Sequence, residues 1–296
     1  MSRRGLLRRA LLITGSIPLT ASVLTALGCG GDDAGDKATP TSATAANTLV
    51  PATVVPSPVP PTVAVGTVGD IKFKGPASDI LGYLALPEGA ATGKKSPAVL
   101  IIHENRGLTD HFRDVARRYA KEGFVAFAID LVSRKGGTSA TDAAANTGAL
   151  GSANPDDLIA DMQAALTFLK AHAAVTPTAI GVTGFCFGGG YAFELGISSK
   201  DIKAAVPYYG TVRRFDELGA TQAAFLVMYG GTDARVTGQA EQVRARLTAA
   251  GKPFEIKIWD GAGHAFFNDT GANYNAATAT GAWTQTLAWL KKYLVA

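Results

Sequence analysis

Residues 179–190 read A-I-G-V-T-G-F-C-F-G-G-G, and this stretch decides the fold. Its first five residues form a short apolar run that is typical of a buried strand, and the residues from 189 onward have a helical pattern. The G-x-C-x-G between them indicates a sharp strand-to-helix turn, a nucleophile elbow, because glycine tolerates the crowding of such a turn. The turn would present Cys186 above the sheet, where the positive end of the helix dipole favours a thiolate. The alternative is a structural cysteine buried in a tight turn.

From residue 63 the chain alternates short apolar runs with longer helical periodicities. This pattern predicts an α/β fold, with a mostly parallel central sheet flanked by helices on both faces. Strands are predicted at residues 80–86, 98–103, 124–129, 179–183, 204–208, 225–229 and 254–259. Helices are predicted at residues 110–122, 156–173, 189–197, 238–250 and 281–293. Ligands of such sheets bind beyond the carboxyl ends of the strands, so residues that follow strands are candidate functional residues.

Two polar residues lie on the loops that follow later predicted strands. Asp233 lies in G-G-T-D-A-R-V after the strand 225–229, and His264 lies in D-G-A-G-H-A-F-F after the strand 254–259. The chain order nucleophile, acid, base is that of the α/β-hydrolases. We therefore predict that His264 takes the thiol proton and later activates water, while Asp233 orients the imidazole. Taken singly, Asp233 could be a turn former and His264 a loop residue.

Glu104 directly follows another predicted central strand, in I-I-H-E-N-R-G-L. A carboxylate there would face the same edge of the sheet as Cys186, where it could hold or exchange a proton with the thiol. The preceding residue, His103, is expected to pack or to hydrogen bond locally. His111 and His172 fall within helical patterns and are expected to be solvated.

The stretches H-E-N-R-G-L, G-F-C-F-G-G-G, G-T-D and G-x-x-H-x-F occur in this order and together resemble the dienelactone hydrolase family. The resemblance runs from about residue 65 to the C-terminus. It implies an α/β-hydrolase fold with a Cys-His-Asp triad, formed here by Cys186, His264 and Asp233.

The resemblance also implies roles for three more residues and an activity. Glu104 would contact the resting thiol and move away when substrate arrives. The backbone N–H groups of Phe187 and Asn105 would form the oxyanion hole. The expected reaction is the opening of a lactone or small carboxylic ester through an acyl-cysteine intermediate, as in carboxymethylenebutenolidases, with no cofactor.

The match is incomplete where substrate would bind. Members that open dienelactones hold the substrate carboxylate between two arginines. Arg134 fits the first position, but the second falls at Asn268. A single arginine could still pair with the carboxylate, or Arg106 or Arg235 could substitute for the second one. Two other functions therefore stay open: a general carboxylesterase or acyl transferase, and a tethered binding protein without turnover. The small-residue stretch 136–154 near the expected site is interpreted as either a lid or a loop.

The charge distribution argues against a nucleic-acid partner, and the cysteine content argues against disulfides and structural metal sites. The chain has 28 basic and 24 acidic residues, and the excess consists of four arginines within residues 1–28. The remainder is electrically balanced, so we expect no nucleic-acid partner. Two cysteines far apart in the sequence provide no disulfide framework, and no cysteine or histidine cluster has the spacing of zinc ligands. We expect neither a structural metal nor a disulfide.

The first 28 residues have the pattern of an export signal. S-R-R-G-L-L-R is followed by an uncharged apolar stretch and resembles a twin-arginine signal. The sequence L-T-A-L-G-C-G-G resembles a bacterial lipoprotein site with Cys29 as the lipidated residue, although Ala26 stands where a larger aliphatic residue is usual. Alternatively, the stretch is a single transmembrane helix, or Cys29 is an ordinary residue of a cleaved signal.

Residues 29–62 are rich in Thr, Ala and Pro, which predicts an extended tether. The predicted organisation is therefore a signal (1–28), a tether (29–62) and one α/β-hydrolase domain (63–296). We expect a protein exported from the cytoplasm and anchored to a membrane as a lipoprotein. The alternative is a soluble periplasmic or secreted protein.

Overall fold

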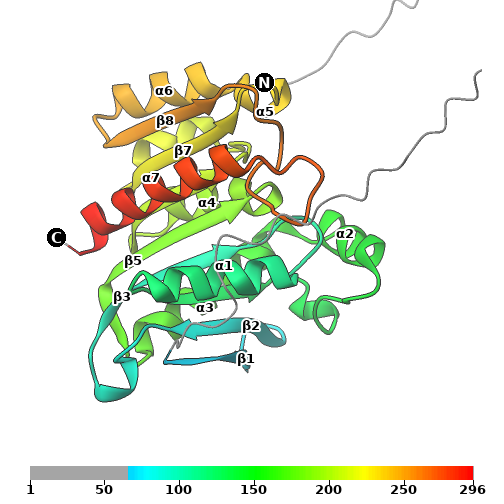
Figure 1. Ribbon diagram of the computed structural model, residues 1–296, viewed down its shortest axis with the longest axis vertical. Helices are drawn as coiled ribbons and strands as arrows, with labels where there is room; N and C mark the ends of the chain where they lie inside the picture. The colour runs from blue at the N-terminus through cyan, green and yellow to red at the C-terminus, as the bar shows by residue number, and fades with distance from the viewer. Residues whose placement is uncertain (1–65, 296) are drawn as a thin grey trace, which may run out of the picture. The chain divides into compact units, whose positions relative to one another are not determined.

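The computed structural model describes residues 66–295, an eight-stranded sheet with helices packed against it (Figure 1). The predicted export signal, the tether and Cys29 lie outside the described residues. Within residues 66–295, no helix combines the length and the apolar character needed to cross a membrane.

The sheet has the strand order β1-β2-β4-β3-β5-β6-β7-β8. Neighbouring strands from β4 to β8 are all parallel, whereas β2 runs antiparallel to both β1 and β4. The strands are β1 (Thr67–Lys74), β2 (Asp79–Leu86), β3 (Ser96–Ile102), β4 (Val125–Asp130), β5 (Val175–Phe185), β6 (Ile202–Tyr208), β7 (Ala224–Gly230) and β8 (Phe254–Trp259). This mostly parallel sheet confirms the predicted fold class.

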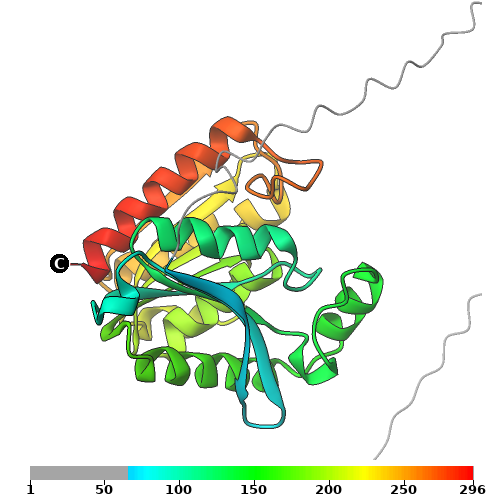
Figure 2. The same ribbon diagram turned by 60° about the horizontal axis from the view of Figure 1, so that its bottom comes forward.

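Helices cover both faces of the sheet (Figures 1 and 2). Helices α1 and α7 pack on one face, and α3, α4 and α6 pack on the other. The helices are α1 (Asp110–Lys121), α2 (Ala143–Gly151), α3 (Pro155–Ala171), α4 (Phe187–Ser198), α5 (Ala234–Thr237), α6 (Ala240–Ala249) and α7 (Ala276–Leu294).

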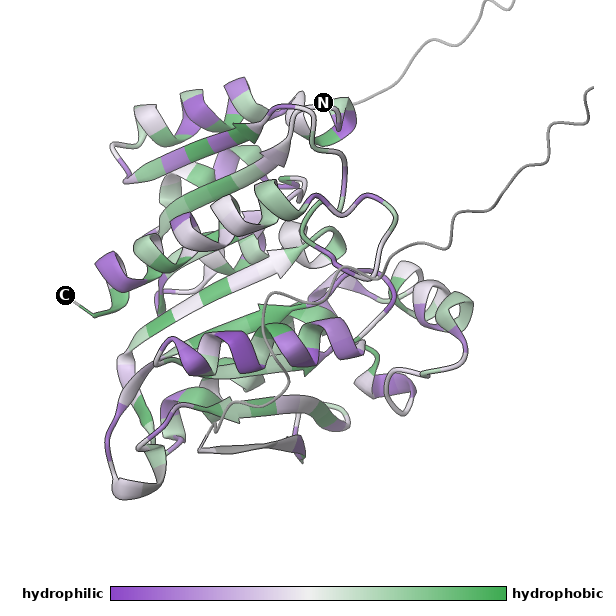
Figure 3. Cartoon of the chain, viewed as in Figure 1, coloured by the Kyte–Doolittle hydropathy of each residue, from purple (hydrophilic) through white to green (hydrophobic). Residues whose placement is uncertain are grey.

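The central strands are buried on both sides, as the apolar runs in the sequence predicted. In β3, Leu100 and Ile102 face the helices α3 and α4, while Val99 and Ile101 face α1 and α7. Figure 3 shows that hydrophobic residues predominate along the central strands of the sheet. The carboxyl ends of these strands therefore have a rigid support.

The structure contains elements that the sequence patterns did not predict, among them strand β1, helix α2 and the single-turn helix α5. Strand β1 is a charged edge strand, T-V-G-D-I-K-F-K, that pairs with β2 along its whole length. Helix α2 lies within the stretch interpreted as a lid or a loop, and its sequence A-A-A-N-T-G-A-L-G has little amphipathic pattern. Its first turn is capped by Asp142, whose side chain accepts a hydrogen bond from the N–H of Ala145 over 2.7 Å.

Candidate active site

The candidate residues gather at one edge of the sheet because each follows a strand at its carboxyl end. Glu104 lies two residues beyond β3, and Cys186 directly follows β5. Asp233 and His264 follow β7 and β8. The parallel strands all end at this edge, so segments up to 160 residues apart in the chain meet there.

The turn at Cys186 has the strained backbone of a nucleophile elbow. Cys186 adopts φ 54° and ψ −111°, and helix α4 begins at the next residue. Its N–H donates a 3.0 Å hydrogen bond to the carbonyl of Tyr208, the last residue of β6. A Cβ atom at Gly184 would lie 2.0 Å from the carbonyl oxygen of Gly188, and one at Gly188 would lie 2.3 Å from that of Ile102. Only glycine fits at these positions, which explains the G-x-C-x-G sequence.

His264 and Asp233 form a hydrogen-bonded pair. Nδ1 of His264 lies 2.5 Å from Oδ2 of Asp233, and the Asp233 side chain is only 7% exposed. The two loops approach closely because Gly230 has no side chain: a Cβ there would lie 2.6 Å from the carbonyl oxygen of Gly263. A carboxylate on Nδ1 fixes the tautomer, and this leaves Nε2 available to accept a proton.

The Cys186 thiol is held in its protonated form. Burial, followed by the negative charge of Glu104, raises the pKa of the thiol to about 11. The backbone N–H groups of Phe187 and Asn105 act in the opposite direction and lower the pKa of the thiol, as does the positive charge of Arg235. The two backbone groups that the family resemblance implied as oxyanion donors therefore converge on the sulfur.

Glu104 is clamped by two neutral donors. The hydroxyl of Tyr209 donates to Oε1 over 3.1 Å, and the amide of Asn268 donates to Oε2 over 2.9 Å. Burial, and then the charge of Glu104, raises the pKa of Tyr209 well above its usual value, so the hydroxyl remains a donor. Thr270 orients the Asn268 amide, because its N–H and its hydroxyl both donate to Oδ1. Neither Tyr209 nor Asn268 was predicted to contact Glu104, and no local sequence signal indicates these contacts.

His103 hydrogen bonds locally, as expected. Nδ1 lies 2.7 Å from the carbonyl oxygen of Glu104, and the N–H of Leu131 donates to Nε2 over 3.0 Å. Because the Leu131 N–H occupies Nε2, the proton of the neutral ring resides on Nδ1. Burial lowers the pKa of His103, which favours this neutral form.

The expectation that His111 is solvated is wrong. Its side chain is buried, with Nδ1 2.7 Å from Oδ1 of Asp269. Arg118 donates to the other carboxylate oxygen of Asp269, also over 2.7 Å. Burial raises the pKa of Asp269, but these two partners outweigh it and hold the pKa well below its usual value. Asp269 thus fastens the loop that carries Asn268 to α1. His172, at the end of α3, is half-buried.

The predicted substrate-binding arginines differ in their surroundings. Arg134 makes two hydrogen bonds to the carboxylate of Asp161, at 2.8 and 3.0 Å, and an ion pair with Asp157 at 3.0 Å. A substrate carboxylate would have to compete with both aspartates for it. Arg106 and Arg235 are exposed, and their guanidinium groups have no hydrogen bond or ion pair within residues 66–295.

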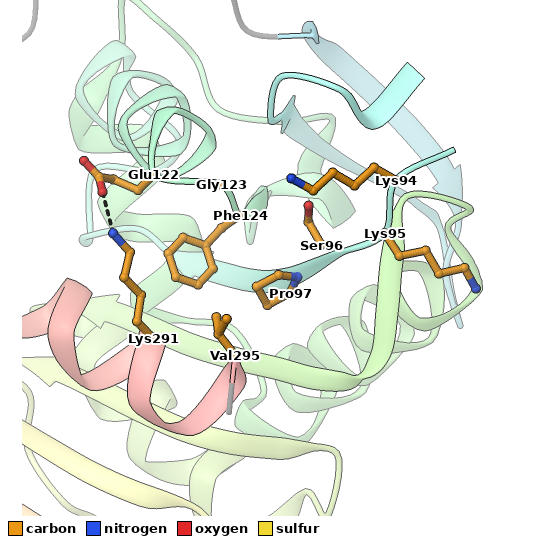
Figure 4. A pocket seen from close by; sticks show the side chains of 9 residues that line it. All are labelled: Lys94, Lys95, Ser96, Pro97, Glu122, Gly123, Phe124, Lys291 and Val295. Atoms are coloured by element: carbon orange, nitrogen blue, oxygen red, sulfur yellow. Dashed lines mark hydrogen bonds and ion pairs between the residues drawn. The ribbon is translucent and has the colours of Figure 1, made fainter. Parts of the chain in front are cut away.

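A cavity of about 520 Å³ lies elsewhere on the domain (Figure 4). It is lined by Lys94, Lys95, Ser96, Pro97, Glu122, Gly123, Phe124, Lys291 and Val295. Ser96 begins β3, so this cavity lies at the amino end of the strand whose other end leads to Glu104. An ion pair between Lys291 and Glu122, at 2.8 Å, crosses one side of it. The cavity is therefore separate from the cluster around Cys186.

The arrangement can support attack of a thiol on a carbonyl carbon. A thiol, an oriented imidazole and two backbone N–H groups lie at one edge of the sheet, and acyl transfer uses groups of these kinds. Within residues 66–295, no group of three or more Cys, His, Asp or Glu side chains is arranged to hold a metal ion.

Comparisons with known proteins agree with this geometry. The model of the dienelactone hydrolase family matches residues 80–294. A "Putative carboxymethylenebutenolidase" of Methylorubrum extorquens is 30% identical over 241 residues, which cover 77% of this chain and 82% of that protein. A "Probable 2-oxo-3-(5-oxofuran-2-ylidene)propanoate lactonase" of Bradyrhizobium is 30% identical over 244 residues, covering 78% and 94%. The crystal structure of a dienelactone hydrolase homologue from Klebsiella pneumoniae superimposes with a TM-score of 0.70 at 26% identity, covering 78% of this chain and all of that one.

Proposed function

We propose that this chain, which belongs to the dienelactone hydrolase family, opens a lactone or small carboxylic ester with Cys186 as its nucleophile. The family membership and the named relatives make the chain a hydrolase. The observation that supports the nucleophile is the position of Cys186 at the sharp turn between β5 and α4, where the backbone N–H groups of Phe187 and Asn105 lower the pKa of its thiol.

In the proposed acylation step, His264 takes the thiol proton and the sulfur attacks the carbonyl carbon. The carbonyl oxygen becomes an oxyanion that the N–H groups of Phe187 and Asn105 stabilise. The C–O bond then breaks, and His264 returns the proton to the leaving alkoxide. With a lactone, the new hydroxyl stays on the acyl group. A water molecule, deprotonated by His264, then hydrolyses the thioester and restores the thiol.

Glu104 would keep the thiol unreactive until substrate binds. Its negative charge disfavours a thiolate beside it, and its two neutral donors hold it in place. A substrate that displaces the carboxylate from the sulfur would remove this repulsion, and the thiol would ionise next to the substrate. This arrangement limits side reactions of a free thiolate.

The lactonase name of the Bradyrhizobium relative supports a lactone substrate. A carboxylate-bearing lactone would be held by Arg106 or Arg235, because Arg134 is already paired with two aspartates. A general carboxylesterase is the second candidate. The neutral Asn268, which contacts Glu104 where the family resemblance places an arginine, favours this broader specificity. A tethered binding protein without turnover would not need the contact between Asp233 and His264.

We also propose that residues 1–62 export the domain and tether it to a membrane through a lipid on Cys29. The twin-arginine pattern and the lipoprotein-like L-T-A-L-G-C-G-G support this proposal. Metabolic labelling with palmitate tests it, with Cys29→Ser as the control. Label on the wild type alone is expected, and an unlabelled wild type would refute lipidation.

Hydrolysis of a dienelactone and of a neutral short-chain ester, by the wild type and by Cys186→Ala, tests the proposed activity. We expect wild-type turnover that falls at least about a thousandfold in the variant. Preference for the lactone would place the chain with the dienelactone-opening enzymes, and ester turnover without preference would favour the carboxylesterase. Equal turnover by the two proteins would refute the cysteine mechanism, and no turnover by either would favour the binding role.

A further inference from the structure

The middle of the segment that supplies the Asn105 N–H is held through its backbone, whereas the side chains of Glu104 and Leu108 at its two ends are buried. We call residues 104–108 the oxyanion loop. The side chains of Asn105 and Arg106, at its centre, are exposed. Apolar packing therefore cannot fix the direction of the Asn105 N–H, and hydrogen bonds to the neighbouring carbonyl groups must do so.

Three consecutive carbonyl groups of the oxyanion loop accept hydrogen bonds. The carbonyl of Glu104 lies 2.7 Å from Nδ1 of His103. The carbonyl of Asn105 accepts from the hydroxyl of Thr147 over 3.1 Å, and the carbonyl of Arg106 accepts from the amide of Asn146 over 3.0 Å. His103 thus holds the loop from the core, and helix α2 holds it from outside.

Asn146 is the better fixed of the two α2 residues. It is only 3% exposed. Its Oδ1 accepts from the N–H of Ser139 over 2.9 Å, and its Nδ2 donates to the carbonyls of Ser139 and Arg106 over 2.8 and 3.0 Å. These contacts use both amide hydrogens and define the amide orientation. The single hydroxyl hydrogen of Thr147 is shared with the carbonyl of Ala143 in its own helix, at 2.9 Å.

We propose that Asn146 is a positioning residue for the oxyanion hole, because its amide, bound to the Arg106 carbonyl, keeps the Asn105 N–H directed at the Cys186 sulfur. The inference rests on the proposed function, in which that N–H stabilises the oxyanion. Peptide units are planar, so the N–H of Asn105 shares its unit with the carbonyl of Glu104, which His103 holds. The Arg106 carbonyl belongs to the second unit further along the chain, and its hydrogen bond to Asn146 restricts the rotation of the unit between them. Helix α2, which stands beyond the strands (Figure 2), is then a support for the site.

An alkyl trifluoromethyl ketone tests this role because it reports on the oxyanion hole without turnover. The Cys186 sulfur adds to the ketone carbon, the thiol proton passes to His264, and the ketone oxygen becomes an oxyanion in the same hole. Its inhibition constant is the ketone concentration that halves the rate at which iodoacetamide alkylates Cys186 in the folded protein. Unfolded protein is alkylated whether or not the ketone is present, so it lowers the fraction of Cys186 that the ketone protects, but it does not change this constant.

The variants are Asn146→Ala and Asn146→Asp, neither of which can donate to the Arg106 carbonyl. In each, kcat/KM should fall about tenfold to a hundredfold through kcat, with KM nearly unchanged. The inhibition constant of the ketone should rise by the same factor. The control is Asn154→Ala, which removes an amide that caps α3 and bonds to the N–H of Asp156 over 3.0 Å. Both quantities should keep their wild-type values in the control.

Wild-type inhibition constants in both Asn146 variants would overturn the inference, and so would a loss confined to the fraction of Cys186 that the ketone protects. An inactive wild type would refute the proposed function instead. The ketone measurement would still decide the role of Asn146, since it requires only addition to Cys186.

Discussion

The side-chain amide of Asn268 donates a hydrogen bond to the carboxylate of Glu104 over 2.9 Å. This contact ties the loop that follows His264 to the carboxylate whose charge raises the pKa of the Cys186 thiol. The loop is fastened in turn by Asp269, which pairs with His111 and Arg118 of α1. The position of Glu104 thus depends on elements more than 150 residues away in the sequence.

Replacing Glu104 by Gln should make the thiol more acidic. The negative charge of Glu104 contributes to the raised thiol pKa of about 11, so its removal stabilises the thiolate. We expect iodoacetamide to alkylate Cys186 about tenfold faster at mildly alkaline pH. The rate as a function of pH checks this, with the surface variant Glu88→Gln as the control. An unshifted profile would contradict the proposed role of Glu104.

Replacing Asn268 by Arg should change substrate preference. A cation at this position would attract a substrate carboxylate and would also stabilise the thiolate. The ratio of kcat/KM for a carboxylate-bearing lactone to that for a neutral ester should rise about tenfold. Ala272→Arg adds the same charge at an exposed position of the same loop and should leave the ratio unchanged. Equal ratios in the two variants would show that Asn268 does not control specificity.

The domain should lose stability in mild acid because of His103. Burial lowers the pKa of His103 below its usual value of 6.5, so the unfolded chain binds the proton more readily than the folded one. The free energy of unfolding should therefore fall as the pH drops below 6.5, by at most about 1.4 kcal/mol per pH unit for one histidine. Urea unfolding between pH 8 and pH 5 measures this dependence.

Two variants test whether His103 causes this pH dependence of the free energy of unfolding. His103→Asn retains a donor for the Glu104 carbonyl but does not titrate, so its stability should depend less on pH. Burial also lowers the pKa of His172, but this side chain is half-buried, so His172→Gln should keep most of the wild-type dependence. The assignment fails if His172→Gln abolishes the dependence and His103→Asn preserves it.

Asp269→Asn should destabilise the domain strongly. The substitution removes one of the two carboxylate partners of Arg118, whose side chain is 8% exposed, and leaves the pair with Asp114 at 2.6 Å. It also weakens the contact with the buried His111. We expect a loss of about 2 kcal/mol in the free energy of unfolding, because hydrogen bonds to a charged group are lost in a nearly buried site. Asp216→Asn breaks the exposed pair with Arg246 and should lose less than about 1 kcal/mol. Similar losses in the two variants would contradict a structural role for Asp269.

The sequence was sufficient to predict the positions of Cys186, Asp233, His264 and Glu104. Each follows an apolar run that forms a strand, so knowledge of the parallel sheet alone places them at one edge. The elbow glycines could be predicted for the same reason, since a local crowding requirement is visible in local sequence.

The partners of these residues could not be predicted, because tertiary contacts create them. Tyr209 and Asn268 reach Glu104 across 105 and 164 positions of the sequence. The helical pattern at His111 gave no sign of Asp269, which lies 158 positions later and keeps the ring buried. Helix α2 was not predicted because its small residues contribute no amphipathic pattern, although its Asn146 bonds to the oxyanion loop.

The covalent intermediate tests the central claim most directly. The protein would be mixed with an activated short-chain ester, quenched in acid during the first turnovers, digested and analysed by mass spectrometry. Cys29→Ser serves as the starting protein, so that Cys186 is its single cysteine. We predict an acyl group on the peptide that contains Cys186, and none when Cys186→Ala is added. Turnover without an acylated Cys186 peptide, or an acyl group that persists in the Cys186→Ala protein, would contradict the mechanism.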